Sequence, residues 1–97
     1  MKQPRIHVDF NEMLDTDLVL LSKSDTKLDS AGNEINLEEG MHVKIYSEDE
    51  DEFGRQDNLI AEGIVELNTE KKGTWGAIAK WNCRIDKNGI RRESESL

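Results

Sequence analysis

The sequence predicts a single small domain built mainly from β-strands, folded as an antiparallel barrel or a strongly curved sheet of about five strands. Two observations lead to this fold class. The chain has 97 residues, which is enough for one hydrophobic core. Short segments with alternating apolar and polar residues recur along it, and Gly, Asn and Asp separate them. No segment has the 3.6-residue periodicity of a long helix, so we expect at most short helical turns.

Two strands are predicted in the first third of the chain. Residues 5–10 alternate between apolar and polar side chains, as a half-buried strand requires. Residues 17–22 have a continuous apolar centre, which is typical of a strand covered on both faces. Tight turns are expected at 29–33 and 86–89, where an Asp precedes Gly or Asn, and we interpret both as hairpin turns.

A third strand is predicted over residues 41–46, where Val43 and Ile45 share one side. It follows a glycine, and the acidic run after it indicates an exposed loop. The segment from Leu37 to Tyr46, in which a Gly turn leads into a hydrophobic strand, is similar to the opening strands of SH3-like barrels. The resemblance implies a barrel and carries no implication about function.

The second half of the chain predicts a long antiparallel hairpin over residues 58–86. We expect partners whose residue numbers sum to 142, because this register sets large side chains opposite small ones and opposite charges opposite each other. The inward pairs are then Leu67 with Trp75, Val65 with Ala77, Gly63 with Ala79, Ala61 with Trp81, and Leu59 with Cys83. The outward pairs are Glu62 with Lys80, Ile64 with Ile78, and Asn58 with Arg84. Both indoles and the thiol would then be buried.

The domain is expected to span residues 1–97, with residues 91–97 as a frayed tail because they show no periodicity. A single cysteine forms no internal disulfide, and the longest aliphatic run has only four residues, 18–21. The start of the chain lacks the apolar stretch of a signal peptide. We therefore expect a cytoplasmic protein that does not contact membranes.

Charge gives the leading functional hypothesis, a non-enzymatic protein-interaction module that binds a protein partner or another copy of itself. The chain has 13 basic and 21 acidic residues, for a net charge of −8. Residues 1–53 carry 14 acidic and 5 basic side chains, whereas residues 54–97 carry 7 and 8. The two halves could present faces of opposite sign, or the sheet could interleave them. The expected acidic partner-binding face is Glu48, Asp49, Glu50, Asp51 and Glu52.

The first alternative is binding of RNA or single-stranded DNA across the outer face of the predicted hairpin. Such proteins combine a basic stripe with exposed aromatic side chains. The candidate contacts are Lys71, Lys72, Lys80, Arg84, Arg91 and Arg92. The net negative charge and the inward placement of both Trp side chains weigh against this alternative.

The second alternative is a small-ligand-binding or enzymatic barrel that uses His7, His42 or the acids around residue 50. No catalytic residues, metal ligands or cofactors are predicted. The run from Asp49 begins like an EF-hand loop, but Phe53 and Ile60 occupy positions that need oxygen ligands. A weak cation site in this loop stays open, and Cys83 is expected to be a buried structural cysteine rather than a nucleophile.

Overall fold

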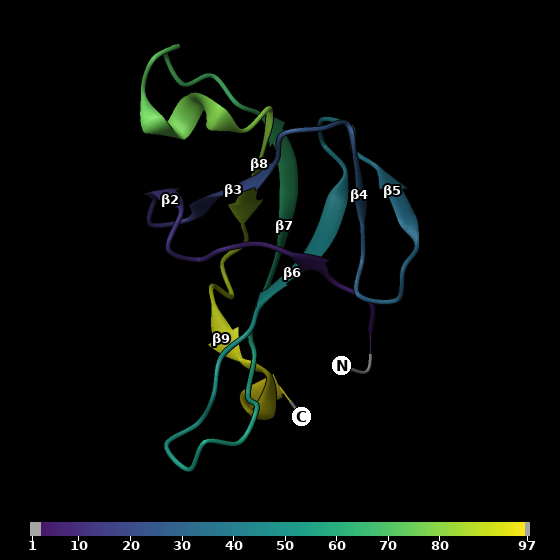
Figure 1. Ribbon diagram of the computed structural model, residues 1–97, viewed down its shortest axis with the longest axis vertical. Coiled ribbons are helices and arrows are strands. Elements are labelled where there is room, and N and C mark those ends of the chain that lie inside the picture. The colour runs from purple at the N-terminus through teal and green to yellow at the C-terminus, as the bar shows by residue number, and fades with distance from the viewer. Residues whose placement is uncertain (1–2, 97) are drawn as a thin grey trace.

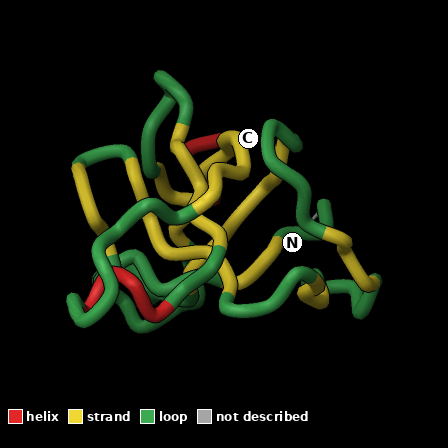
Figure 2. The backbone as a smooth tube through the Cα atoms, turned by 90° about the horizontal axis from the view of Figure 1, so that it is seen from above, coloured by secondary structure: helices red, strands yellow, loops and turns green. Residues whose placement is uncertain are grey.

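The computed structural model describes residues 3–96 and confirms a mainly β fold with no helices beyond 3-10 turns. In chain order the strands are β1 (Ile6–His7), β2 (Met13–Asp15), β3 (Leu18–Ser22), β4 (Thr26–Leu28), β5 (Glu34–Asn36), β6 (His42–Ser47), β7 (Leu59–Leu67), β8 (Trp81–Ile85) and β9 (Arg91–Arg92). The two 3-10 turns span Trp75–Ile78 and Glu93–Ser96. The first lies in the connection between β7 and β8, and the second follows β9 directly (Figure 2).

Within the described residues, seven strands form one mixed sheet in the order β1-β6-β7-β8-β3-β2, and β9 pairs with β7. The β4–β5 hairpin stands beside this sheet (Figure 1). Strand β1 runs parallel to β6, with Ile6 opposite Ile45, and the other pairs are antiparallel. The molecule is elongated, with extents of 41 × 26 × 22 Å.

The predicted closure into an SH3-like barrel is wrong, because the sheet stays open. Its two edge strands, β1 and β2, follow each other in sequence but do not pair. Between them Asp9 forms a turn, in which its Oδ1 accepts a hydrogen bond from the Asn11 amide and its carbonyl accepts one from the Glu12 amide. This turn ends the extended conformation, so the expected strand over 5–10 shrinks to the two residues of β1. Both edges are very short, which limits edge-to-edge aggregation.

The predicted hairpin register is also wrong, although the faces it assigned to β7 and β8 are right except at Leu67, which was expected inward and is 46% exposed. Gly63 pairs with Ile85 and Val65 with Cys83, so partner numbers sum to 148 instead of 142. The shift is an even number of residues, and alternating side chains therefore keep their faces. Ala61, Val65 and Cys83 are fully buried as expected. The expected partnerships of Glu62 with Lys80 and of Asn58 with Arg84 do not form.

The shift arises because residues 75–80 do not continue β8. Trp75–Ile78 is a 3-10 turn, and Trp75 is 58% exposed, whereas Trp81 is buried at 9%. Gly76 lies within this turn: it is buried, and a Cβ at this position would collide with Leu14 Cδ2. The prediction that both indoles point inward is therefore correct for Trp81 and wrong for Trp75.

Both expected Asp turns are present, but only the first joins paired strands. Asp29 Oδ1 accepts hydrogen bonds from the amides of Ala31 and Asn33, and the turn connects β4 to β5. The turn at 86–89 leads from β8 to β9, and both of these strands lie along the same edge of β7. The second turn therefore separates two strands that pair with β7 one after the other, and it does not close a hairpin.

The segment 91–97, expected to fray, contains β9 and the second 3-10 turn in its described part. Asp57 anchors it: its two carboxylate oxygens accept hydrogen bonds from the Ser94 amide (3.0 Å) and hydroxyl (2.8 Å). These bonds hold the pKa of the Asp57 carboxyl below its usual value. Leu97 lies outside the described residues.

Candidate functional site

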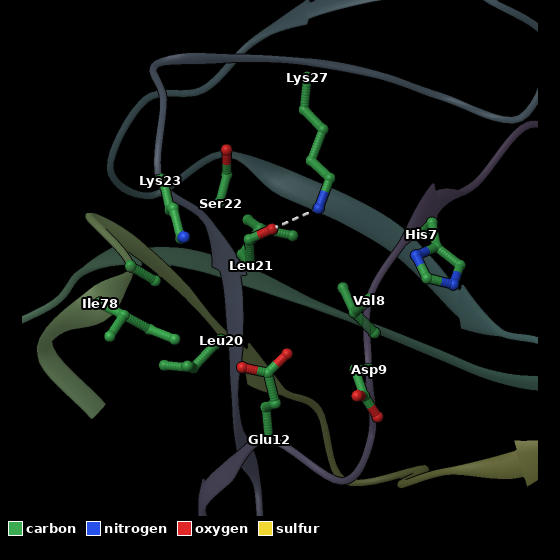
Figure 3. A pocket seen from close by; sticks show the side chains of 11 residues that line it. His7, Val8, Asp9, Glu12, Leu20, Leu21, Ser22, Lys23, Lys27 and Ile78 are labelled. Atoms are coloured by element: carbon green, nitrogen blue, oxygen red, sulfur yellow. Dashed lines mark hydrogen bonds between the residues drawn. The ribbon is translucent and has the colours of Figure 1, made fainter. Parts of the chain in front are cut away.

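A hollow of about 300 Å³ lies beside β3, between the segment that follows β1, strand β4 and the first 3-10 turn (Figure 3). Its volume is at the lower end of the about 300–1,000 Å³ typical of small-molecule sites. Its lining combines charged and apolar side chains from four parts of the chain: His7, Val8, Asp9, Glu12, Leu20, Leu21, Ser22, Lys23, Lys27, Ile78 and Ala79.

Two opposite charges face each other across this hollow. The half-buried Lys27 donates a hydrogen bond of 2.7 Å from Nζ to the Leu21 carbonyl, which directs the amine inward (Figure 3). Burial lowers the pKa of Lys27, and the negative charge of Glu12 partly opposes this. Glu12 forms no ion pair with Lys27 or any other described residue, since none of the N–O distances of 4.0 Å or less involves it. The two charges are therefore near each other and unpaired.

His7 is the one histidine of the second alternative that lies at the hollow; His42 lines neither hollow described here. The His7 ring packs edge-on against Tyr46, with 5.4 Å between ring centroids and an interplanar angle of 76°. This contact fixes the imidazole on the rim. The apolar wall is formed by Val8, Leu20 and the exposed Ile78.

A second surface lies on the β7–β8 connection, residues 68–80, which projects at one end of the long axis (Figure 1). We call Trp75, Ile78, Lys71 and Lys72 the basic apolar end. Trp75 and Ile78 are 58% and 51% exposed, and a shallow hollow runs between them. Asn68 holds the loop in shape by donating hydrogen bonds from Nδ2 to the carbonyls of Gly76 and Ala79. An ordered connection thus presents a Trp to solvent.

The expected acidic face lies on the loop 48–57, which projects at the opposite end of the long axis (Figure 1). Two of its five carboxylates are tied down internally: Asp49 lies 3.2 Å from Arg92, and Asp51 accepts hydrogen bonds from the amides of Phe53 and Arg55. The side chains of Glu48, Glu50 and Glu52 make no hydrogen bond or ion pair within the described part of the chain. Phe53, at the tip, is 71% exposed.

The six basic residues of the nucleic-acid alternative do not lie in one stripe. Four form ion pairs: Lys80 with Asp25 (2.7 Å), Arg84 with Asp17 (2.9 Å) and Glu66 (3.2 Å), Arg91 with Glu62 (2.5 Å), and Arg92 with Asp49 (3.2 Å). Lys71 and Lys72 stand at the opposite end of the molecule from β9 and have no ion-pair partner among residues 3–96. Only these two therefore offer unpaired positive charge.

Three charged side chains, Glu62, Arg5 and Arg91, form a largely enclosed cluster. The Glu62 carboxylate accepts from Arg5 Nη1 at 2.6 Å and from Arg91 Nη2 at 2.5 Å. Burial would raise the pKa of Glu62, but hydrogen bonds from both guanidinium groups outweigh it and lower that pKa. Arg5 also donates to the Ala61 carbonyl, so it ties β1 to β7 across β6. Because the carboxylate is saturated by two arginines, we interpret this cluster as structural.

Cys83 is fully buried in the core, as expected. Burial raises the pKa of its thiol to about 12, so the thiolate is not populated near neutral pH. In the described part of the chain no trio of His, Cys, Asp or Glu is arranged to hold a metal ion. No helix within residues 3–96 combines the length and apolarity needed to cross a lipid bilayer.

Sequence reasoning did not single out Glu12 and Lys27, two of the four Asp, Glu or Lys residues that line the hollow. Glu12 lies just before β2 and Lys27 in β4, and no motif joins them, so no local signal could have paired them. The exposure of Trp75 did have a signal, because glycines at 73 and 76 flank it closely. Comparisons with protein-family models, with curated proteins and with solved structures find no match to this chain.

Proposed function

We propose that this protein is a non-enzymatic interaction module that associates with copies of itself head to tail. The carrying observation is that its two projecting loops are opposite in charge, each exposes an aromatic side chain, and they stand at opposite ends of a 41 Å long molecule (Figure 1). The basic apolar end of one copy would receive the acidic loop, residues 48–57, of the next.

Charge favours this pairing of ends. Apart from Lys80, which is paired with Asp25, the loop 68–80 carries two lysines against one glutamate, and the loop 48–57 carries six carboxylates against one arginine. Complementary charge orients two molecules and disfavours contact between like ends. Lys71 and Lys72 on one side and Glu48 and Glu52 on the other are free to pair across the contact, since none of them forms an ion pair within residues 3–96.

The exposed aromatic residues supply the apolar part of the contact. Trp75 and Phe53 are among the large apolar side chains that the fold leaves open to water. Aromatic residues are enriched at the centres of protein interfaces because a buried ring contributes about 150–250 Å² of contact area. The shallow hollow between Trp75 and Ile78 is of a size to receive one side chain, and Phe53 at the tip of a projecting loop is suited to enter it.

Contacts between two different ends do not close into a dimer of twofold symmetry. They leave one basic end and one acidic end free in every assembly, so a series of growing oligomers is expected. Each contact is small, and weak association is therefore expected. The net charge of −8 opposes the approach of two copies, so added salt both screens this repulsion and weakens the end contacts. Charge reversal is a cleaner test than salt.

The test uses light scattering after size exclusion over a concentration series of about 10 µM to about 1 mM. One variant blocks the basic apolar end with Trp75→Ser, Lys71→Glu and Lys72→Glu. The other blocks the acidic end with Phe53→Ser, Glu48→Lys and Glu52→Lys. The control is Leu28→Ser, which removes an equally exposed apolar side chain on the β4–β5 hairpin, 62% exposed.

The wild type and the control should grow in mass with concentration, and each blocked variant should stay monomeric. An equimolar mixture of the two blocked variants should give dimers and nothing larger, because each retains one competent end. A wild type that is monomeric at the highest concentration would overturn the proposal. A mixture that stays monomeric, or a blocked variant that still grows, would do the same.

A second candidate function is binding of single-stranded nucleic acid at the basic apolar end alone. The exposed Trp75 favours it, because base stacking on an aromatic ring beside two unpaired lysines is a common mode of recognition. The ion-paired arginines would take no part. Fluorescence anisotropy with a labelled oligouridine should show salt-sensitive binding that Trp75→Ala abolishes, and no retention at low salt would end this candidate.

A further inference from the structure

We propose that the hollow beside β3 binds a free α-amino acid with an apolar side chain. The geometry points to Lys27 as the partner of the ligand carboxylate and to Glu12 as the partner of its ammonium group. The hollow shares Ile78 with the basic apolar end, but Lys27 and Glu12 take no part in the pairing proposed for self-association, and this site requires no second copy.

The unpaired charges carry the argument. Lys27 and Glu12 point toward one another across the hollow without forming an ion pair (Figure 3). The Lys27 amine uses one donor on the Leu21 carbonyl, and its remaining donors are available to a ligand. The half-buried Glu12 carboxylate makes no hydrogen bond or ion pair with any described residue. A zwitterion placed between them would satisfy both.

A ligand with one kind of charge fits less well. A simple carboxylate would pair with Lys27 but would add a negative charge near Glu12, and a simple amine would meet the reverse problem. Like charges that approach closely in a partly desolvated site disfavour binding. Burial alone lowers the pKa of Lys27, and a bound carboxylate would reverse that shift because it stabilises the ammonium form.

The rest of the lining sets the class of side chain. Val8, Leu20 and Ile78 form an apolar wall, and Asp9 and Lys23 stand beside the two charges (Figure 3). The hollow has about 300 Å³, which is enough for a branched aliphatic side chain but small for a larger cofactor. Leucine is therefore the probe of choice, because it combines both charges with an isobutyl group.

The experiment is a titration of the labelled full-length chain followed by amide chemical shifts. Leucine is compared with isocaproate, which keeps the side chain and the carboxylate, and with isoamylamine, which keeps the side chain and the amine. The variants Lys27→Met and Glu12→Gln each remove one charge and keep most of the side-chain volume. The control variant is Lys87→Met, on the exposed turn at 86–89.

Leucine should give saturable shifts at residues of the hollow, and each analogue should bind at least about tenfold more weakly because one charge-assisted contact is lost. Lys27→Met and Glu12→Gln should weaken leucine binding by the same factor, and Lys87→Met should not change it. The absence of saturation with leucine, equal binding of either analogue, or shifts that map outside the hollow would each overturn the proposal. The analogue comparison needs no variant, so it stands even if a substitution impairs folding.

Discussion

Gly63, in the middle of β7, offers a sharp test of how tightly the two central strands are packed. A Cβ built there would lie 2.7 Å from Cys83 Sγ and 2.8 Å from the carbonyl carbon of Arg84, and closer still to the Arg84 oxygen. Two of these three atoms belong to the backbone of β8, which is hydrogen-bonded to β7 on one side and to β3 on the other. They cannot move away as a flexible side chain would, and we therefore expect Gly63→Ala to strain the sheet itself.

The magnitude follows from that environment. Overpacking costs about 1–3 kcal/mol where side chains can adjust, so contact with backbone places Gly63→Ala at about 3 kcal/mol or above. A domain of this size has a total unfolding free energy of about 5–15 kcal/mol. With a urea m-value of about 1.5 kcal/mol/M, the midpoint of unfolding should fall by about 2 M. Trp fluorescence during urea titration measures this shift.

Gly32→Ala is the matched control, because it adds the same atom in open space. Gly32 has φ of +84° and no atom would lie within 4 Å of the added Cβ, so only the backbone conformation opposes the change. That cost is about 1 kcal/mol. If Gly63→Ala proves no more destabilising than Gly32→Ala, the close packing of β7 against β8 is wrong.

Three further predictions follow from the same structure. Glu62→Gln should lower the unfolding free energy by about 3 kcal/mol because Arg5 and Arg91 lose their shared counter-charge, whereas Glu52→Gln should leave urea denaturation unchanged. The Cys83 thiol, with a pKa of about 12, should resist iodoacetamide at pH 8 in the native protein and react fully in urea, and rapid native labelling would contradict its burial. The carboxyls of Asp57 and Glu62 have lowered pKa values, so their contribution to stability is complete above about pH 4.5 and is lost as the pH falls through their pKa values in the folded protein. In thermal melts the melting temperature of Asp57→Asn should therefore fall less steeply with acidification than that of the wild type. An equal pH dependence would refute the role of the hydrogen bonds from Ser94.

The sequence predicts burial in this fold better than it predicts pairing. Alternation places Val65 and Cys83 inward whatever the register, because their parity is unaffected by an even shift. The choice among even registers depends on where β8 begins, and β8 begins only after a turn in which Gly76 lies close to Leu14, 62 positions away in sequence. Complementarity between facing residues of the hairpin gives no information about this contact. It therefore favours a register in which partner numbers sum to 142 instead of 148.

Local sequence patterns likewise could not predict whether the sheet closes into a barrel. Closure would require the edge strands β1 and β2 to pair, and they do not; the chain turns at Asp9 between them. The alternation over 5–10 correctly indicates that Ile6 and Val8 are buried. They belong to the hydrophobic core of an open sheet, however, and not to the interior of a barrel. A parallel partner for β1 was not anticipated because its neighbour β6 is about forty residues away in sequence.

The charge asymmetry between the two halves is partly neutralised by ion pairs and partly kept on the surface, and the sequence alone could not tell which residues follow which course. Basic residues of the second half pair with acids of the first, as Lys80 does with Asp25 and Arg84 with Asp17. Such exposed pairs contribute little to stability, but they remove these charges from any partner. Unpaired charges of opposite sign remain on the two projecting loops, at Lys71 and Lys72 and at Glu48 and Glu52. For that reason we propose that association uses the ends of the molecule rather than its faces.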